Sequence, residues 1–381
     1  MKLSQIYRIA LTCTILLCAG WQNVSAGDLL SRKDSLALAQ LMENYLDEKE
    51  KVYDKQTQEL EALIETKAEI GDSIFTIRYE EASARHSKES EKMRKDFMQK
   101  LANNPQFAPV IKLHDLLENY TAEYQKAYHQ LELENEKEEN TFEDLNDFHI
   151  FQEMPFEYEW DRKFIELVRA NPNLLELPEE LIAETINPNM TICTSDDGCL
   201  RYYSWPTSHG GTMIDIASFR QFRTPDGQVL VSWESDSDNE TEADDDWEWK
   251  TLVQDIYTIQ IGGKKVYLLE KWSNSSSKFA SYQYTADSID NNTISHPKIF
   301  FDGENFTQNF TVDYDRFFQW DLQEQGIDYW IVSFDPDNQT IYSRIPILDE
   351  NGDTINSEDY LSYPFNGQYY DVSEYSEIAI W

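Results

Sequence analysis

The sequence predicts an α+β protein: a helical N-terminal module, built as a coiled hairpin or small bundle, followed by an antiparallel all-β domain. Apolar residues recur at helical spacing up to about residue 187, whereas from residue 190 onward they alternate with polar residues. Turn-forming pairs of Gly, Asn and Asp cluster in the second part. We therefore expect a signal peptide over residues 1–26, the helical module over 27–187 and the β domain over 188–381.

The helical module begins with a capping box at Ser31-Arg32-Lys33-Asp34, where side chains satisfy the first free backbone N–H groups. Gly71-Asp72 ends or bends this first helix. Its apolar stripe consists of Leu38, Leu41, Met42, Tyr45, Val52, Leu60, Leu63 and Ile64.

Three further helical segments are expected. One runs from about Ile77 to Leu101, the next starts near Ala108, and Phe156–Ala170 resumes the helical spacing. The middle helix has an aromatic face that we interpret as core rather than as a sugar-stacking or ligand surface. This face consists of Val110, His114, Leu117, Tyr120, Tyr124, Tyr128 and Leu131.

The β domain starts with the stretch Asp196–Met213, in which two turns enclose an aromatic strand. Gly262-Gly263 separates two alternating runs and predicts a tight hairpin. About ten strands are expected, which fits a sandwich, an open barrel or a few propeller-like blades. No fixed-period repeat is present, which disfavours the propeller.

Residues 1–26 have the form of a secretory signal peptide, with Lys2 and Arg8 before an apolar stretch and Val24-Ser25-Ala26 at the end. An uncleaved anchor and a lipoprotein at Cys18 are the alternatives. Leu17 disfavours lipidation of Cys18, because the residue before a lipidated cysteine is usually small. We expect an exported protein of the periplasm, cell surface or extracellular space, with no transmembrane helix after cleavage.

The chain is strongly acidic, with 71 Asp+Glu against 32 Lys+Arg and a net charge of −39. Loss of Lys2 and Arg8 would bring the net charge to −41. This charge repels nucleic acid and anionic lipid surfaces and favours cationic partners. Aromatic residues make up 13% of the chain, enough for a sizeable core.

Cys193 and Cys199 are the cysteines that remain after signal cleavage. In an exported protein they are expected to form a disulfide across the Asp196-Asp197-Gly198 turn, contributing roughly 1–3 kcal/mol. A redox or metal role is disfavoured, because there are only two thiols and no histidine nearby before His209.

The segment from Asp197 to Met213 resembles an uncharacterised family of secreted proteins of Gram-negative bacteria, which carries the pattern DGxLRxYSWxT…GGTM. Cys199 and Pro206 depart from the pattern, which commonly has Lys and Asp there. The resemblance covers the C-terminal half and implies export, but no known activity.

No catalytic residue can be assigned from the sequence. His209-Gly210-Gly211 is similar to the oxyanion-hole turn of lipases, but the G-x-S-x-G pentapeptide that this chemistry needs is missing. There is also no H-E-x-x-H motif for metal-dependent hydrolysis.

Two acidic stretches are weak candidates for a Ca²⁺ site, since Ca²⁺ prefers several oxygen ligands. Residues 234–248 hold nine carboxylates and no basic residue. Residues 349–353 place oxygens at alternate positions, although the glycine and glutamate of a calcium loop are missing. A solvated loop and a hairpin turn are the alternatives. The candidate ligands are Asp244, Asp245, Asp246, Asp349, Asn351 and Asp353.

The missing catalytic motifs and the charged helices favour a non-enzymatic interaction or binding protein for an unknown protein or glycan ligand. The alternative is a carbohydrate-active or other hydrolase that uses carboxylates on the β domain, because carboxylates and strand aromatics are abundant.

Overall fold

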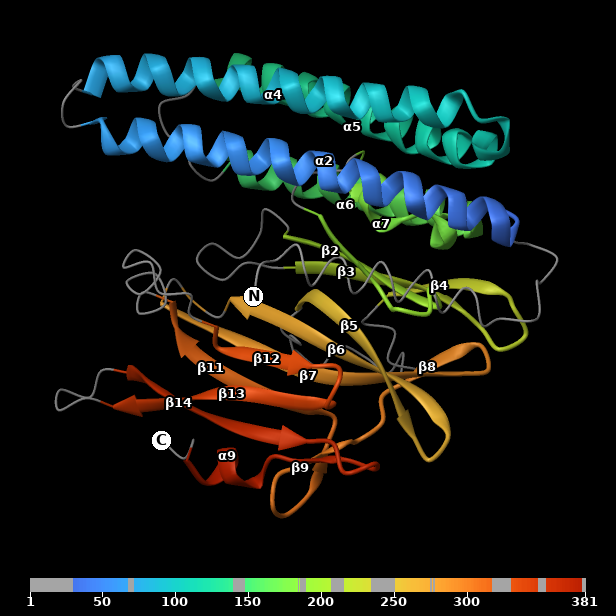
Figure 1. Cartoon of the computed structure of the whole chain (residues 1–381), viewed down its shortest axis with the longest axis vertical. Coiled ribbons are helices and arrows are strands. Elements are labelled where there is room, and N and C mark those ends of the chain that lie inside the picture. The colour runs from blue at the N-terminus through green and yellow to red at the C-terminus, as the bar shows by residue number, and fades with distance from the viewer. Residues whose placement is uncertain are drawn as a thin grey trace. The chain divides into compact units, whose positions relative to one another are not determined.

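The helices come first in the chain and the strands follow, as the sequence predicts (Figure 1). The chain divides into two compact units, Met1–Leu116 and Leu117–Trp381. Among the described helices, none combines the length and the apolar content that a membrane crossing requires. The computed structural model describes residues 30–67, 72–139, 148–183, 185, 190–206, 216–233, 251–274, 276, 278–316, 330–348 and 354–378.

In the first unit, α2 (Arg32–Glu65) and α4 (Asp72–Ala102) pack as an antiparallel pair. The backbone N–H of Asp34 donates to Ser31 Oγ at 3.3 Å, which confirms the predicted cap. Tyr45 stacks on Phe97 with 4.4 Å between ring centroids. The buried core of this unit includes Leu38, Met42, Tyr45, Ala82, Phe97 and Leu101, with Phe107 from η1 (Pro105–Phe107).

Helix α4 begins at Asp72, earlier than the start near Ile77 that the sequence predicts. Ile74 and Ile77 are exposed, which is why the apolar pattern does not mark this turn.

The second unit begins within α5 (Ala108–Glu139) and contains α6 (Phe148–Ala170), η2 (Pro172–Glu176) and α7 (Glu179–Ala183). Tyr120 of α5 donates a hydrogen bond to the carbonyl of Trp160 at 3.0 Å and packs edge-on against its ring. The predicted inward face of α6 is buried, namely Trp160, Phe164, Ile165 and Val168.

The second compact unit contains helices as well as strands, since it begins at Leu117. The reason is that α6 shares the core of the strands. Phe164 lies 5.7 Å from Tyr203 and 5.6 Å from Phe219 between ring centroids. A change of hydrophobic period marks a change of secondary structure and does not show which elements share a core.

The first sheet is antiparallel and has the order β1-β2-β3-β4. Strand β2 is buried along most of its length, as its dense aromatic sequence predicts. The strands are β1 (Thr191–Thr194), β2 (Leu200–Pro206), β3 (Ile216–Arg223) and β4 (Val229–Trp233).

The second sheet has the order β11-β7-β6-β5, with β8 paired to β7. Gly262 and Gly263 join β5 to β6 with φ of 58° and 81°, which confirms the predicted hairpin turn. The strands are β5 (Leu252–Ile261), β6 (Lys264–Asn274), β7 (Phe279–Asp290), β8 (Thr293–Ser295) and β11 (Asn309–Asp315).

Two three-stranded sheets complete the unit, in the orders β10-β9-β15 and β12-β13-β14. The short β9–β15 pair is parallel, an exception to the antiparallel pattern. The elements are β9 (Phe300–Phe301), β10 (Phe306–Thr307), β12 (Val332–Asp335), β13 (Thr340–Leu348), β14 (Thr354–Pro364), β15 (Tyr370–Asp371) and α9 (Ser373–Ile378).

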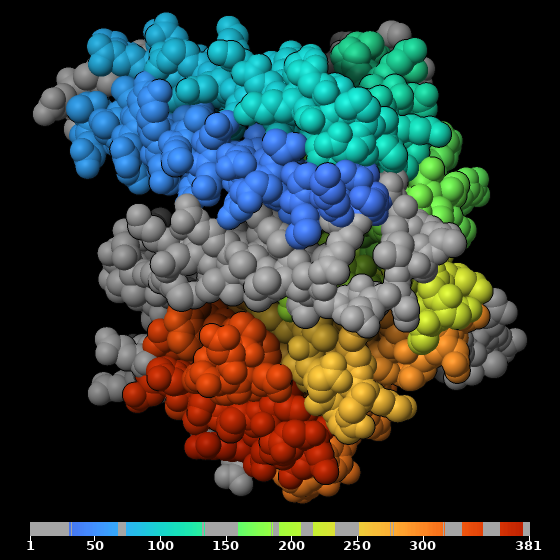
Figure 2. All heavy atoms as spheres, turned by 45° about the vertical axis from the view of Figure 1, so that its right-hand side comes forward, coloured from blue at the N-terminus to red at the C-terminus, as the bar shows by residue number. Residues whose placement is uncertain are grey.

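Strand β6 contributes to two cores, because adjacent residues on a strand point to opposite faces. Leu269 joins a core with Tyr202 and the β1–β2 turn, whereas Leu268 joins a core with Tyr363 and the C-terminal strands. In Figure 2 these C-terminal strands, in orange and red, lie against β5 and β6, in yellow.

Candidate functional site

The turn from Ser195 to Cys199, singled out in the sequence, is a tight structural turn between β1 and β2. Gly198 has φ of 65°, which other residues rarely adopt. Asp197 Oδ1 accepts hydrogen bonds from Ser195 Oγ at 2.7 Å and from the Cys199 N–H at 2.9 Å. Burial opposes ionisation of Asp197, but bonds from Lys265 and Ser195 outweigh it and lower its pKa. This carboxylate stabilises the turn.

Arg201, the arginine of the same segment, is buried and links the strands to the preceding helical residues. Its guanidinium donates to the carbonyl of Leu174 at 2.7 Å and to that of Leu177 at 2.5 Å. Its Nε donates to Thr194 Oγ1 at 2.7 Å. All three partners belong to the chain itself, so Arg201 has a structural role.

The structure corrects the predicted disulfide: Cys193 and Cys199 are free, buried thiols. In the β1–β2 pairing, Cys193 lies opposite Tyr202, three positions beyond Cys199. That offset is about 10 Å along a strand, whereas a disulfide requires Cα atoms within about 7 Å. Cys193 Sγ instead donates to the carbonyl of Val253 at 3.2 Å. Burial raises the pKa of both thiols, to about 11 for Cys199, which disfavours the reactive thiolate.

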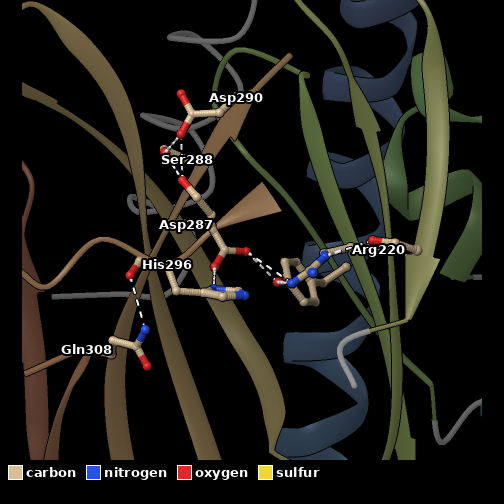
Figure 3. A network of polar contacts seen from close by, with 9 residues as sticks. Arg220, Asp287, Ser288, Asp290, His296 and Gln308 are labelled. Carbon is tan, nitrogen blue, oxygen red and sulfur yellow. Dashed lines mark hydrogen bonds and ion pairs between the residues drawn. The ribbon is translucent and has the colours of Figure 1, made fainter. Parts of the chain in front are cut away.

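A buried polar network connects the first sheet to the second (Figure 3). Asp287 of β7 is its centre and is 1% exposed. Its Oδ2 accepts a hydrogen bond from Tyr202 at 2.6 Å and lies 3.6 Å from Arg220 Nη1, while its Oδ1 lies 2.8 Å from His296 Nδ1. Arg220 Nε donates to Ser232 Oγ at 3.0 Å.

Asp287 is ionised in this network. Burial acts to raise its pKa, but the hydrogen bond from His296 and the charge of Arg220 outweigh burial and leave the pKa lowered. An ionised carboxylate accepts hydrogen bonds, so His296 carries its proton on Nδ1. The His296 ring is partly exposed, and its contact with the buried Asp287 fixes the orientation of the ring. Because Tyr202 and Arg220 are buried, neither can contact a substrate, and their role in the network is structural.

A second polar group consists of half-buried carboxylates around Asp255. Asp255 follows a β-bulge in β5 and lies directly opposite Glu270 of β6. Facing like charges destabilise a strand pair. Tyr284 donates to Glu270 Oε2 at 2.7 Å, and the N–H of Ile256 donates to Asp255 Oδ1 at 2.8 Å.

The pKa values of Asp255, Glu270, Glu179 and Asp196 are all raised. Burial is the main cause for Glu270, and Asp255 adds to it, so that its pKa is about 7. Burial, together with Glu180, raises the pKa of Glu179 to about 7. Burial and Asp255 raise the pKa of Asp196 to about 6. Such groups remain partly protonated near neutral pH and can donate or accept a proton.

These four carboxylates do not form a preassembled metal site. Among the described residues, Asp196, Asp255, Glu179 and Glu270 do not supply three ligand oxygens within 4.8 Å of one another. A Ca²⁺ ion needs six to eight close oxygen ligands. The arrangement therefore suits proton transfer better than metal binding.

An aromatic face lies on β13 and β14. Tyr360 is 53% exposed, the largest exposure of a described aromatic residue in the strands. Its ring centroid lies 5.5 Å from that of Tyr342 and 5.9 Å from that of Trp330. Arg344 covers the Trp330 ring at 4.6 Å. The strand register places Tyr360 opposite Arg344, and Ser362 and Ser333 on either side of Tyr342.

The opposite side of the same strands is the core. Ile341, Ser343, Tyr363 and Val332 are all buried. Alternation along a strand therefore directs Tyr342, Arg344 and Tyr360 away from the core. We use the name aromatic face for Trp330, Ser333, Tyr342, Arg344, Tyr360 and Ser362.

The remaining predicted sites lie outside the described residues. This holds for the signal peptide over residues 1–26 and for His209-Gly210-Gly211. It also holds for the candidate Ca²⁺ ligands Asp244, Asp245, Asp246, Asp349, Asn351 and Asp353.

No protein-family model matches the chain, and no match was found among the curated proteins or the solved structures.

Sequence reasoning missed both groups of residues. The alternation of Tyr342 and Arg344 on one strand and of Tyr360 and Ser362 on another was the available signal for the aromatic face. The hairpin-turn interpretation of residues 349–353 pairs these two strands, but it does not fix the register that brings Tyr360 beside Tyr342. The Asp255–Glu270 pair depends on a β-bulge that no local sequence motif indicates.

Proposed function

We propose that this protein is an exported, non-enzymatic binding protein whose ligand lies on the aromatic face of β13 and β14. The cluster of the exposed Tyr360 with the half-buried Tyr342 and Trp330 carries this proposal. Large rings that keep part of their surface exposed side by side mark interaction sites, because burying that surface on binding is favourable. The signal-peptide pattern over residues 1–26 supports export.

The composition of the face suits binding better than catalysis. It offers three aromatic rings, the hydroxyls of two serines and two tyrosines, and one guanidinium. The groups with perturbed proton affinity, Asp255 and Glu270, lie on other strands. Tyrosine and tryptophan provide contact area with little loss of side-chain freedom, which is why they dominate binding surfaces.

The test is a thermal-shift screen of the purified protein against soluble oligosaccharides, peptides and amines. A ligand that binds only the folded state raises the melting temperature. We expect at least one compound to stabilise the wild type but not the Tyr342→Ala, Tyr360→Ala double variant. A screen without any stabilising compound, or a shift that persists in the double variant, contradicts the proposal.

A second candidate function is a carbohydrate-active or other hydrolase, and the facing Asp255 and Glu270 favour it. One carboxyl with a raised pKa beside another is the arrangement that general acid–base hydrolysis uses. The test is release of reducing ends from soluble polysaccharides at pH 5–8. If this function holds, Glu270→Gln and Asp255→Asn each abolish the release. Equal release by the wild type and both variants rules these residues out.

A further inference from the structure

The geometry of the aromatic face indicates the class of its ligand, an inference that rests on the proposed function. The Tyr342 and Tyr360 rings are inclined by 77°, and the Trp330 and Tyr360 rings by 52°. The three rings therefore form a corner and not a plane. A flat crystalline polymer needs coplanar rings, whereas a corner contacts one ligand unit from two sides.

The polar groups beside the rings match a sugar. The C–H-rich face of a pyranose packs against an aromatic ring, and its hydroxyls need partners that donate and accept. Ser333 and Ser362 lie on either side of Tyr342, and each hydroxyl can do both. The Tyr360 hydroxyl is also accessible, since the side chain is exposed. An apolar peptide would leave these hydroxyls unused.

Charge decides between neutral and acidic sugars. The only basic group of the aromatic face, Arg344, has its guanidinium stacked on Trp330 at 4.6 Å. The whole chain carries a net charge of −39, which repels a polyanion at moderate ionic strength. A neutral glycan avoids this repulsion.

We propose that the aromatic face binds a soluble, neutral glycan chain, with one sugar unit seated in the corner between Tyr360 and Tyr342. The neighbouring units interact with Trp330 and the two serines. Arg344 fixes the orientation of Trp330 and does not recognise an acidic group.

The test is affinity electrophoresis of the full exported chain in native gels. The gels contain a neutral soluble polysaccharide (a mixed-linkage glucan, a galactomannan or dextran), polygalacturonate, or no polymer. A parallel sedimentation uses crystalline cellulose. The variants are Tyr342→Ala, Tyr360→Ala and, because Tyr342 is partly buried, Tyr360→Ala alone. The matched control is Phe279→Ala, Phe306→Ala, which removes two aromatic rings that are also exposed.

We expect retardation of the wild type by at least one neutral polysaccharide and no sedimentation with cellulose. The double variant is expected to bind at least tenfold more weakly, and Tyr360→Ala alone several-fold more weakly. The control variant is expected to migrate like the wild type. Circular dichroism of each variant reports whether it is folded.

The outcomes separate this inference from the proposed function. If only polygalacturonate retards the protein, or if the protein binds only to cellulose, the proposal of a neutral soluble glycan is wrong. The proposal that the aromatic face binds a ligand is retained. The glycan proposal also fails, and the binding face is retained, if no gel retards the protein and a peptide or amine stabilises the wild type but not the double variant. If no compound of any class depends on Tyr360, both proposals fail.

Discussion

Replacing Glu270 with glutamine is expected to make the second unit more stable at pH 8 and to reduce the dependence of its stability on pH. Glu270 faces Asp255 across the β5–β6 pair, and its pKa is raised from 4.5 to about 7. The folded state therefore binds a proton more tightly than the unfolded state. The contribution of Glu270 to stability is therefore greatest below pH 4.5, falls as the pH rises towards 7, and stays reduced above it.

The magnitude follows from the shift. At about 1.4 kcal/mol per pKa unit, the raised pKa corresponds to about 3 kcal/mol at full effect. Solvent screening of a half-buried carboxylate reduces this, so we expect about 1–3 kcal/mol. Glutamine removes the charge, and its side-chain oxygen can still accept the hydrogen bond that Tyr284 donates to Glu270 Oε2.

The assay is urea unfolding at pH 4.5 and pH 8, followed by tryptophan fluorescence. Glu304→Gln is the control, because Glu304 is exposed. We expect the free energy of unfolding of Glu270→Gln to be larger than that of the wild type at pH 8 and equal to it at pH 4.5. A variant that loses stability at pH 8, or that keeps the wild-type pH dependence, refutes the reasoning about the facing carboxylates.

Three further predictions concern the buried polar groups. Asp287→Asn is expected to cost about 3–5 kcal/mol in urea unfolding, because Arg220 is left buried without its carboxylate; a loss below 1 kcal/mol contradicts the buried pair. Alkylation of the unfolded protein without reductant is expected to modify both Cys193 and Cys199, since neither is in a disulfide; an intact mass showing no alkylation restores the bridge. Arg201→Met is expected to destabilise the second unit by about 2–4 kcal/mol, because buried carbonyls lose their donors; an unchanged urea midpoint contradicts its bridging role.

The local parts of the fold could be predicted from the sequence. The cap at Ser31 and the turn at Gly262-Gly263 follow from rules that involve a few neighbouring residues. The inward face of α6 follows from helical periodicity. Each of these features depends on spacing within one element, which a sequence displays directly.

The disulfide prediction was wrong because it assumed a register. The turn between Cys193 and Cys199 was placed correctly, but β1 pairs with β2 so that Cys193 faces Tyr202. Ser195 and Leu200 close the turn, and Cys199 lies within it. A pairing register depends on which residues of both strands are buried, and this information comes from the rest of the core.

The polar groups could not be predicted for a related reason. Tyr202, Arg220 and Asp287 come from three strands of two sheets, and their charges are compatible only when the sheets pack together. Counting carboxylates in the sequence finds dozens of equivalent candidates. Only the strand register distinguishes Asp255 and Glu270 from the others.

The most direct test of the binding face is hydrogen–deuterium exchange of the whole chain with and without a neutral oligosaccharide that stabilises it. Backbone amides next to a ligand exchange more slowly when it is bound. We predict slower exchange in β13 (Thr340–Leu348) and β14 (Thr354–Pro364), and no change in the Tyr342→Ala, Tyr360→Ala variant. Protection around Asp255 and Glu270 instead would contradict the account and favour the hydrolase.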